Sequence, residues 1–150
     1  MFGNKIYKIL SKEDLEKISS KIKTAEENTS AEIVVSIKNN IPFVFDNNIN
    51  KFALSLFKFY KIYKTENKTG ILILFVIKNK QFYILGDEGI YKKVDQKVWD
   101  DLSVSISKEI NEKNLLEGIM KSIELTSILV DYHFPKNEND VNEISNEVKF

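Results

Sequence analysis

The chain has 150 residues, and 43% of them are hydrophobic, which suffices for one ordinary core and predicts a single domain. Lysines and acidic residues both number 22, so the formal net charge of zero predicts no general attraction to nucleic acid or to an anionic membrane. The chain has no cysteine, no arginine and one histidine, His133, which excludes disulfides, thiol catalysis, bidentate binding of phosphate by a guanidinium group and metal sites with several histidines.

The apolar segments of the chain predict neither export nor membrane insertion. Residues 1–10 alternate charged with apolar side chains and lack the continuous apolar core of a signal peptide. The longest apolar run, residues 71–77, is far shorter than the roughly 20 residues that a membrane helix needs. We therefore expect a cytoplasmic protein.

The first helix is predicted to begin after Ser11. Residues 11–14 have the pattern of a capping box, with Asp14 in place of the usual glutamate. Apolar residues then recur at helical spacing as far as a polar cluster, and these are Leu15, Ile18, Ile22 and Ala25. In residues 32–37 every second residue is aliphatic, which predicts a strand.

The middle of the chain predicts a helix followed by a hairpin. Residues 49–60 carry an apolar stripe at helical spacing. After the polar stretch 64–70, residues 71–77 form an uninterrupted β-prone run, which is typical of a central strand buried on both faces. The short turn at residues 78–80 predicts that residues 81–85 return as an antiparallel partner.

The rest of the chain predicts two more helices, at about residues 94–110 and 115–132, and Pro135 ends the second one. Residues 136–150 are polar and acidic, so we expect a tail that is either loosely docked or disordered. The predicted domain therefore spans residues 1–135.

The order of these elements predicts an α/β fold with a small mixed sheet. It contains one β-α-β unit, and such crossovers join parallel strands. The first two strands are then parallel, while the second and third form a hairpin. As a result, the starts of strands one and two and the end of strand three lie at the same edge of the sheet.

Carboxylates from separate elements converge on that edge. Hard cations such as Ca²⁺ or Mg²⁺ bind several oxygen ligands, so the convergence predicts a cation site. Two other interpretations stay open: residues 86–89 also have a common turn sequence, and acidic residues in a first helical turn also favour the helix macrodipole. The carboxylates are those of Glu32, Asp87, Glu88, Asp95, Asp100 and Asp101.

The order of several motifs resembles the TPM domain family, which is found in thylakoid-lumen and photosystem-repair proteins and in many bacterial proteins. The resemblance extends from about Ser11 to Val148, and the chain is most similar to the short soluble bacterial branch. It implies a three-layer α/β/α sandwich around a small mixed sheet. The motifs are Thr29-Ser30-Ala31-Glu32-Ile33-Val34-Val35, Ala53 with Phe57, Lys64-Thr65, Gly70-Ile71-Leu72-Ile73, Gly86-Asp87-Glu88-Gly89-Ile90, Trp99-Asp100, Leu115-Leu116-Glu117-Gly118-Ile119, and Phe134-Pro135 with Asp140-Val141-Asn142-Glu143-Ile144.

The resemblance also implies a function. Members are associated with binding of divalent cations, calcium especially, and some plant members with acid phosphatase activity. It implies that a Ca²⁺ or Mg²⁺ ion is held by residues among Asp87, Glu88, Glu32, Asp100 and Asp101. Two departures stand out: Ala31 replaces the family's usual glycine, and Lys68-Thr69 replaces an Arg-Asn pair, which weakens recognition of a phosphate ester because lysine offers only a point charge.

Three functions follow as hypotheses. The first is a non-catalytic or weakly catalytic cation-binding protein, because the sequence shows no constellation of nucleophile and base. The second is a metal-dependent phosphatase acting on phosphomonoesters, with Asp87 or Glu88 holding the ion and Lys68 and Asn67 contacting the substrate or anion. The third is a protein-interaction module whose acidic tail, from Glu138 to Glu147, binds an unidentified protein partner.

Overall fold

The computed structural model describes residues 9–136 and 142–150. Two regions for which the sequence makes a prediction lie outside these residues. One is most of residues 1–10, which we expect not to form a signal peptide, and the other is Glu138, the first residue of the predicted acidic tail. Among the described residues, no helix has both the length and the apolar character needed to cross a membrane.

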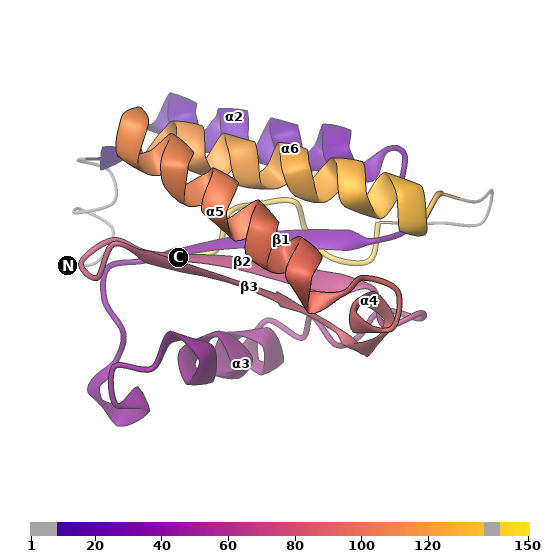
Figure 1. The fold of residues 1–150 in the computed structure, drawn as a ribbon, viewed down its shortest axis with the longest axis horizontal. Helices are drawn as coiled ribbons and strands as arrows, with labels where there is room; N and C mark the ends of the chain where they lie inside the picture. Colours follow the sequence, from indigo (N-terminus) through magenta and orange to yellow (C-terminus); the bar gives the residue numbers. More distant parts are fainter. Residues whose placement is uncertain (1–8, 137–141) are drawn as a thin grey trace.

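Helices cover both faces of a central sheet, which confirms the expected three-layer α/β/α arrangement (Figure 1). One face is covered by α2 (Lys12–Glu26), α5 (Gln96–Glu112) and α6 (Leu115–His133). The other is covered by α3 (Ile49–Phe59).

Short polar side chains determine where these helices begin. The predicted capping box is present: Asp14 N donates to Ser11 Oγ at 3.0 Å, and Ser11 N donates to Asp14 Oδ2 at 2.9 Å. Asn48 and Asn114 cap α3 and α6 in the same way, each with its Oδ1 accepting from a backbone N–H three residues later.

The sheet of the described residues has three strands in the order β1-β2-β3. They are β1 (Glu32–Lys38), β2 (Gly70–Val76) and β3 (Gln81–Gly86). The first two are parallel, with Glu32 opposite Gly70, and the last two are antiparallel, with Ile71 opposite Gly86. The predicted crossover and hairpin are thus confirmed.

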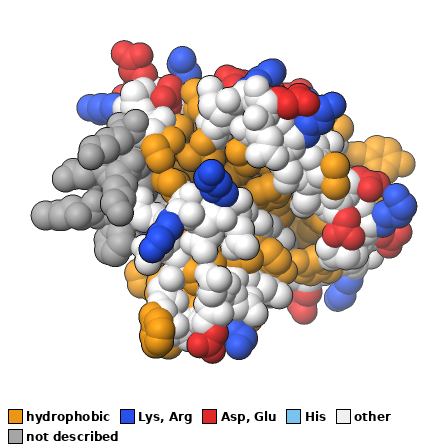
Figure 2. Space-filling view, turned by 60° about the vertical axis from the view of Figure 1, so that its left-hand side comes forward, with side chains coloured by type: hydrophobic (Ala, Val, Ile, Leu, Met, Phe, Trp, Pro, Cys, Tyr) orange, Lys and Arg blue, Asp and Glu red, His pale blue; other side chains and the backbone are white. Residues whose placement is uncertain are grey.

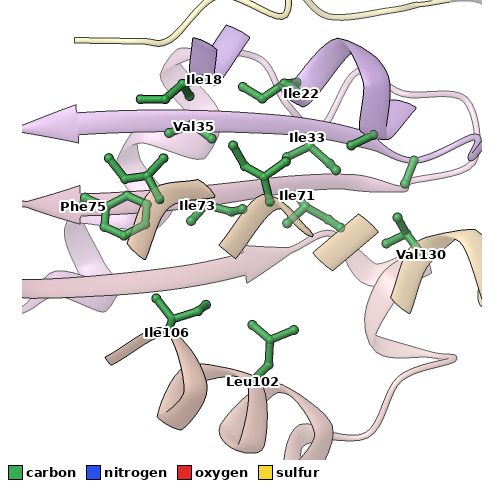
Figure 3. Packing of buried hydrophobic residues seen from close by; sticks show 14 of the residues in the cluster. Ile18, Ile22, Ile33, Val35, Ile71, Ile73, Phe75, Leu102, Ile106 and Val130 are labelled. Atoms are coloured by element: carbon green, nitrogen blue, oxygen red, sulfur yellow. The ribbon is translucent and has the colours of Figure 1, made fainter. Parts of the chain in front are cut away.

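Strand β2 is buried along its whole length because both of its faces pack against helices. One face joins Ile33 and Val35 of β1 under α2, α5 and α6, as Figure 3 shows for Ile71, Ile73 and Phe75. The alternate residues pack against α3. Each fully buried aliphatic side chain of this kind stabilises the fold by about 1.5–3 kcal/mol.

Two short helical elements were not expected from the sequence. One is η1 (Phe43–Phe45), which follows Pro42. The other is α4 (Glu88–Tyr91), within a segment interpreted as the end of the hairpin. Asp87 caps α4, and Gly89 N donates to Lys68 O at 2.9 Å, so α4 depends on a backbone contact with a distant loop that local patterns do not reveal.

The described part of the C-terminal segment, residues 142–150, is docked along the outer edge of β1. Lys149 N donates to Val35 O and Ile37 N donates to Lys149 O, both at 2.9 Å, in a parallel bridge. Val148 and Ile144 pack against the two core clusters. The segment therefore covers backbone groups that an edge strand would otherwise expose.

The crossing of α5 and α6 generates a stability prediction. A Cβ added to the buried Gly118 would overlap Cγ1 of Ile110, although alanine at a helix interior normally stabilises by about 1 kcal/mol relative to glycine. We expect Gly118→Ala to lower the free energy of unfolding by about 1–3 kcal/mol, measured by urea denaturation.

The control for this prediction is the double variant Gly118→Ala/Ile110→Ala compared with Ile110→Ala alone. Removal of the long Ile110 side chain makes room for the new methyl group. The glycine substitution should then be neutral or stabilising. Equal destabilisation in both backgrounds would contradict the steric explanation.

Candidate functional site

The sheet edge predicted to collect the site residues exists in the structure. Glu32 N donates to Thr69 O at 3.1 Å, and Asp87 N donates to Gly70 O at 2.9 Å. Gly89 lies against the same loop, because a Cβ there would be 2.5 Å from the carbonyl oxygens of both Asn67 and Lys68. The backbones of β1, the loop before β2 and the start of α4 therefore meet as the topology predicted.

Asp87 and Glu88 have different surroundings. Asp87 Oδ1 accepts a hydrogen bond from Glu88 N at 2.8 Å, while Asp87 Oδ2 is buried without a hydrogen-bond partner. Glu88 is exposed on the first turn of α4. Asp87 therefore has one free acceptor oxygen, and Glu88 is open to solvent.

The remaining predicted ligands lie on the exposed side of α5. Asp100 Oδ1 accepts from Gln96 Nε2 at 3.0 Å, and Asp101 Oδ2 pairs with Lys97 Nζ at 3.1 Å. Both contacts are exposed pairs one helical turn apart. Asp95 is at the N-cap position of α5 and its side chain makes no capping hydrogen bond.

Lys68 and Asn67, the predicted anion contacts, belong to the loop before β2. Lys68 Nζ donates to Tyr63 O at 2.9 Å, so its ammonium group is turned toward its own loop. Within the described ranges, no three or more side chains of histidine, cysteine, aspartate or glutamate lie together as a metal-binding group.

A pair of carboxyl groups, Glu26 and Glu32, occupies the same edge on the α2 side. Glu32 begins β1 and is 4% exposed, and Glu26 ends α2 with its Oε2 accepting from Ile33 N at 3.0 Å. The two carboxyl groups are close enough to share a proton in a hydrogen bond. Glu26 Oε1 is buried and accepts no hydrogen bond from a protein N–H group.

Burial of this pair changes its protonation. Loss of solvent, together with the hydrogen bond and the charge of Glu32, raises the pKa of Glu26 to about 9. Burial also raises the pKa of Glu32, although hydrogen bonds from Glu26 and from backbone N–H groups oppose the shift. Both carboxyl groups therefore favour the protonated form, and the pair keeps a proton at neutral pH.

The C-terminal segment binds to the Glu32 carboxylate. Glu143 N donates to Glu32 Oε1 at 2.6 Å, and Asn142 Nδ2 donates to Glu32 Oε2 at 2.9 Å. Glu143 in turn accepts from Glu66 N at 3.2 Å, which ties the segment to the loop before β2. A buried carboxylate at the start of β1 therefore anchors a segment more than a hundred residues later in the chain.

These elements line a cavity of about 180 Å³ that is open to solvent on one side. Its wall at the turn between α2 and β1 is held by the end of α6, because Thr29 Oγ1 donates to Phe134 O at 2.5 Å and Ser30 N donates to the same oxygen at 2.8 Å. Asn146 Oδ1 is buried without a partner in this wall. The lining residues are Lys23, Glu26, Glu27, Thr29, Ser30, Ala31, Glu32, Lys136, Asn142 and Asn146.

Sequence reasoning found Glu32 but missed Glu26. One signal was available: a glutamate in the last turn of a helix opposes the macrodipole and needs another reason to be there. Asn142 lies in a motif that carries the family resemblance, but the polar composition of residues 136–150 predicts a tail, so neither Asn142 nor Asn146 is predicted as a site residue.

Comparison with known proteins determines the family of this chain. The model of the TPM domain matches residues 5–127, which is most of the chain and includes every strand of the described sheet. The chain belongs to the TPM domain family. A search of curated proteins gives no match.

Two solved structures resemble this TPM domain. The NMR structure of BA42 from the psychrophilic bacterium Bizionia argentinensis matches with a TM-score of 0.84 and 28% identity over 93% of this chain and 94% of that one. The N-terminal domain of a P. gingivalis protein matches with a TM-score of 0.69 and 16% identity over 84% of this chain and 79% of that one, which shows a shared fold.

The Glu26 carboxyl generates a prediction about stability and pH. Above the ordinary pKa of 4.5 and below about 9, the folded TPM domain retains a proton on Glu26 that the unfolded chain has released. The unfolded state then binds fewer protons, so the free energy of unfolding should fall as the pH rises through this window, by up to about 1.4 kcal/mol per pH unit.

The variant Glu26→Gln should flatten this dependence, because glutamine imitates the protonated carboxyl at every pH. Urea denaturation between about pH 5 and pH 8 measures the slope. Glu27→Gln, at the exposed neighbouring position, is the matched control and should keep the wild-type slope. An unchanged slope in Glu26→Gln would assign the dependence to other groups.

Proposed function

We propose that this TPM domain binds a divalent cation, Ca²⁺ or Mg²⁺, in the cavity between the end of α2, the start of β1 and the C-terminal segment. One observation carries the proposal: Asn146 Oδ1 is a buried acceptor oxygen without a partner, and it lines this cavity beside the carboxyl pair of Glu26 and Glu32, whose shared proton a bound cation would displace. Buried acceptors that lack a donor cost free energy, and a cation is one of the groups that can satisfy them.

The chemistry of the cavity suits a hard cation. Ca²⁺ takes six to eight oxygen ligands at flexible angles, from carboxylates, amide and backbone carbonyls, and water. The cavity offers two carboxyl groups, Glu26 and Glu32, and two asparagine side chains. Since two carboxylates are too few for all-protein coordination, water would supply the remaining ligands.

Asp87 is the alternative ligand for the ion, as the sequence predicted. Its Oδ2 is also buried without a partner, and Glu88 follows it directly. The exposed Asp100 and Asp101 are weaker candidates, because each already pairs with a side chain on its own helix. We place the ion at Glu26 and Glu32 because the cavity beside them has a further acceptor oxygen without a partner.

A metal-dependent phosphatase is the second candidate, because the matching family model carries phosphatase in its name. In that case Asp87 or Glu88 would hold the ion, and Lys68 would have to leave Tyr63 O to reach a phosphate oxygen. Metal-stimulated hydrolysis of p-nitrophenyl phosphate that disappears in Asp87→Asn would favour this function over simple cation binding. Turnover that survives the substitution would show that Asp87 does not hold a catalytic ion.

A titration with Ca²⁺ and then Mg²⁺, followed by calorimetry and amide NMR shifts, tests the cation site. We expect saturable shifts around residues 26–33 and 142–146. Glu26→Gln and Asn146→Ala should each weaken binding by about tenfold or more, because the first removes the carboxylate charge and the second removes an oxygen ligand. Asp87→Asn is the control and should leave affinity unchanged, since asparagine also caps a helix.

The reverse pattern would overturn this placement. If Asp87→Asn abolished binding while Glu26→Gln left it intact, the ion would sit at the α4 turn that the sequence predicted. No saturable response to either metal would contradict cation binding altogether.

A further inference from the structure

The charge of this chain is divided between two parts of the molecule. Residues 38–80 contain eight lysines, one aspartate and one glutamate, a formal charge of +6, so the rest of the chain carries −6. Residues 38–80 include η1 and α3, which form the layer below the sheet in Figure 1. The zero net charge thus averages a cationic stretch, residues 38–80, and an anionic remainder; Lys51, Lys58, Lys61 and Lys64 of that stretch belong to α3 and the turn after it.

The lysines of this layer are available for an anionic partner. Within residues 9–136 and 142–150, the ion pairs join Lys97 with Asp101 and Lys113 with Glu109, all of them on α5 or at its end. No lysine of residues 38–80 is neutralised by an acid in that part of the chain.

Large apolar side chains protrude from the same layer. Phe43 is 97% exposed and Val44 is 76% exposed, both in the turn η1 that leads into α3. Phe59, at the end of α3, is 76% exposed. Figure 2 shows hydrophobic side chains reaching the surface near basic ones on the end of the molecule that it presents.

Helix α3 is basic and apolar on its outward face. Phe52, Ala53, Leu56 and Phe57 are buried against the sheet, so the exposed Lys51, Leu54 and Lys58 occupy the opposite side at a helical spacing of three and four. We name the exposed residues of this layer the α3 surface; they are Phe43, Val44, Lys51, Leu54, Lys58, Phe59 and Lys61.

We propose that the α3 surface docks onto an anionic lipid bilayer. In this arrangement Phe43, Val44 and Phe59 enter the boundary between headgroups and acyl chains, while Lys51, Lys58 and neighbouring lysines attract the lipid phosphates. Burial of apolar side chains and attraction of basic residues are the two contributions that hold a peripheral protein on a membrane. Exposed aromatic and aliphatic side chains supply the first, and lysines that form no ion pair among the described residues supply the second.

The chemistry favours lipid over nucleic acid. Single-stranded nucleic acid is bound by aromatic rings on which bases stack; Phe43 and Phe59 have such rings but Val44 and Leu54 do not, whereas the acyl-chain boundary of a bilayer takes all four side chains. The anionic layer provides a contrast: α5 and α6 together hold three lysines and seven acidic residues, so their exposed Val104 and Ile128 would approach an anionic bilayer against electrostatic repulsion. Apolar exposure and positive charge coincide on the α3 surface.

Co-sedimentation of the full chain with vesicles tests the proposal. We expect binding to vesicles of phosphatidylglycerol, weaker binding at high salt, and little binding to vesicles of phosphatidylcholine. Phe43→Ser should lower the partition constant about tenfold or more, because a large apolar group no longer enters the lipid. Lys58→Glu should lower it about fivefold or more. Val104→Ser, a change at an exposed apolar residue on α5, is the control and should leave it unchanged.

A fluorescence measurement reports insertion directly. Phe43→Trp places an indole at the exposed turn, and its emission should shift to shorter wavelength with phosphatidylglycerol vesicles. The native Trp99, which is 5% exposed, supplies a constant background. Absence of sedimentation with phosphatidylglycerol, or Phe43→Ser binding like the wild type, would overturn the proposal. Binding of a single-stranded DNA oligonucleotide without vesicle binding would overturn it in favour of a nucleic-acid surface.

Discussion

Burial of β2 on both faces is the constraint on which the rest of this structure depends. A strand without a polar face needs a layer of helices on each side of the sheet. The chain that connects it to a parallel neighbour must cross one of these layers. Helix α3 serves both needs, since it is the crossover between β1 and β2 and the cover of one face. The edge at which Glu32, Gly70 and Asp87 meet follows from that connection and from the hairpin.

The parts of the fold that sequence could predict are those specified by local periodicity. The uninterrupted apolar run at residues 71–77 indicates a buried strand, and the capping box at Ser11 indicates the start of a helix. In contrast, α4 depends on a hydrogen bond between Gly89 and Lys68, and the docked C-terminal segment depends on the backbone of β1. Such contacts join residues far apart in the chain, and no periodic pattern within either segment reveals them.

The difference between local patterns and long-range contacts also explains which residues of the candidate site the sequence predicts. Topology placed Glu32 at the correct sheet edge, because the position of a strand end follows from strand order. It could not determine which carboxylate would face Glu32, because that depends on the path of the turn after α2. Hydrogen bonds from Thr29 and Ser30 to Phe134 fix that path, so the end of α6 determines where the side chain of Glu26 lies. The positions of Glu26 and Glu32 relative to each other thus depend on α2, β1 and the end of α6.

The α3 surface shows why net charge is a poor guide to partners in a layered fold. A crossover helix must bury one face and therefore carries its polar residues on the other, where they accumulate within one short stretch of sequence. When those residues are mostly lysines, the outer layer becomes cationic whatever the total charge. The charges are separated here because α5 and α6, on the opposite face of the sheet, hold seven acidic residues and three lysines. The buried strand that organises the core therefore also separates the charges of the surface.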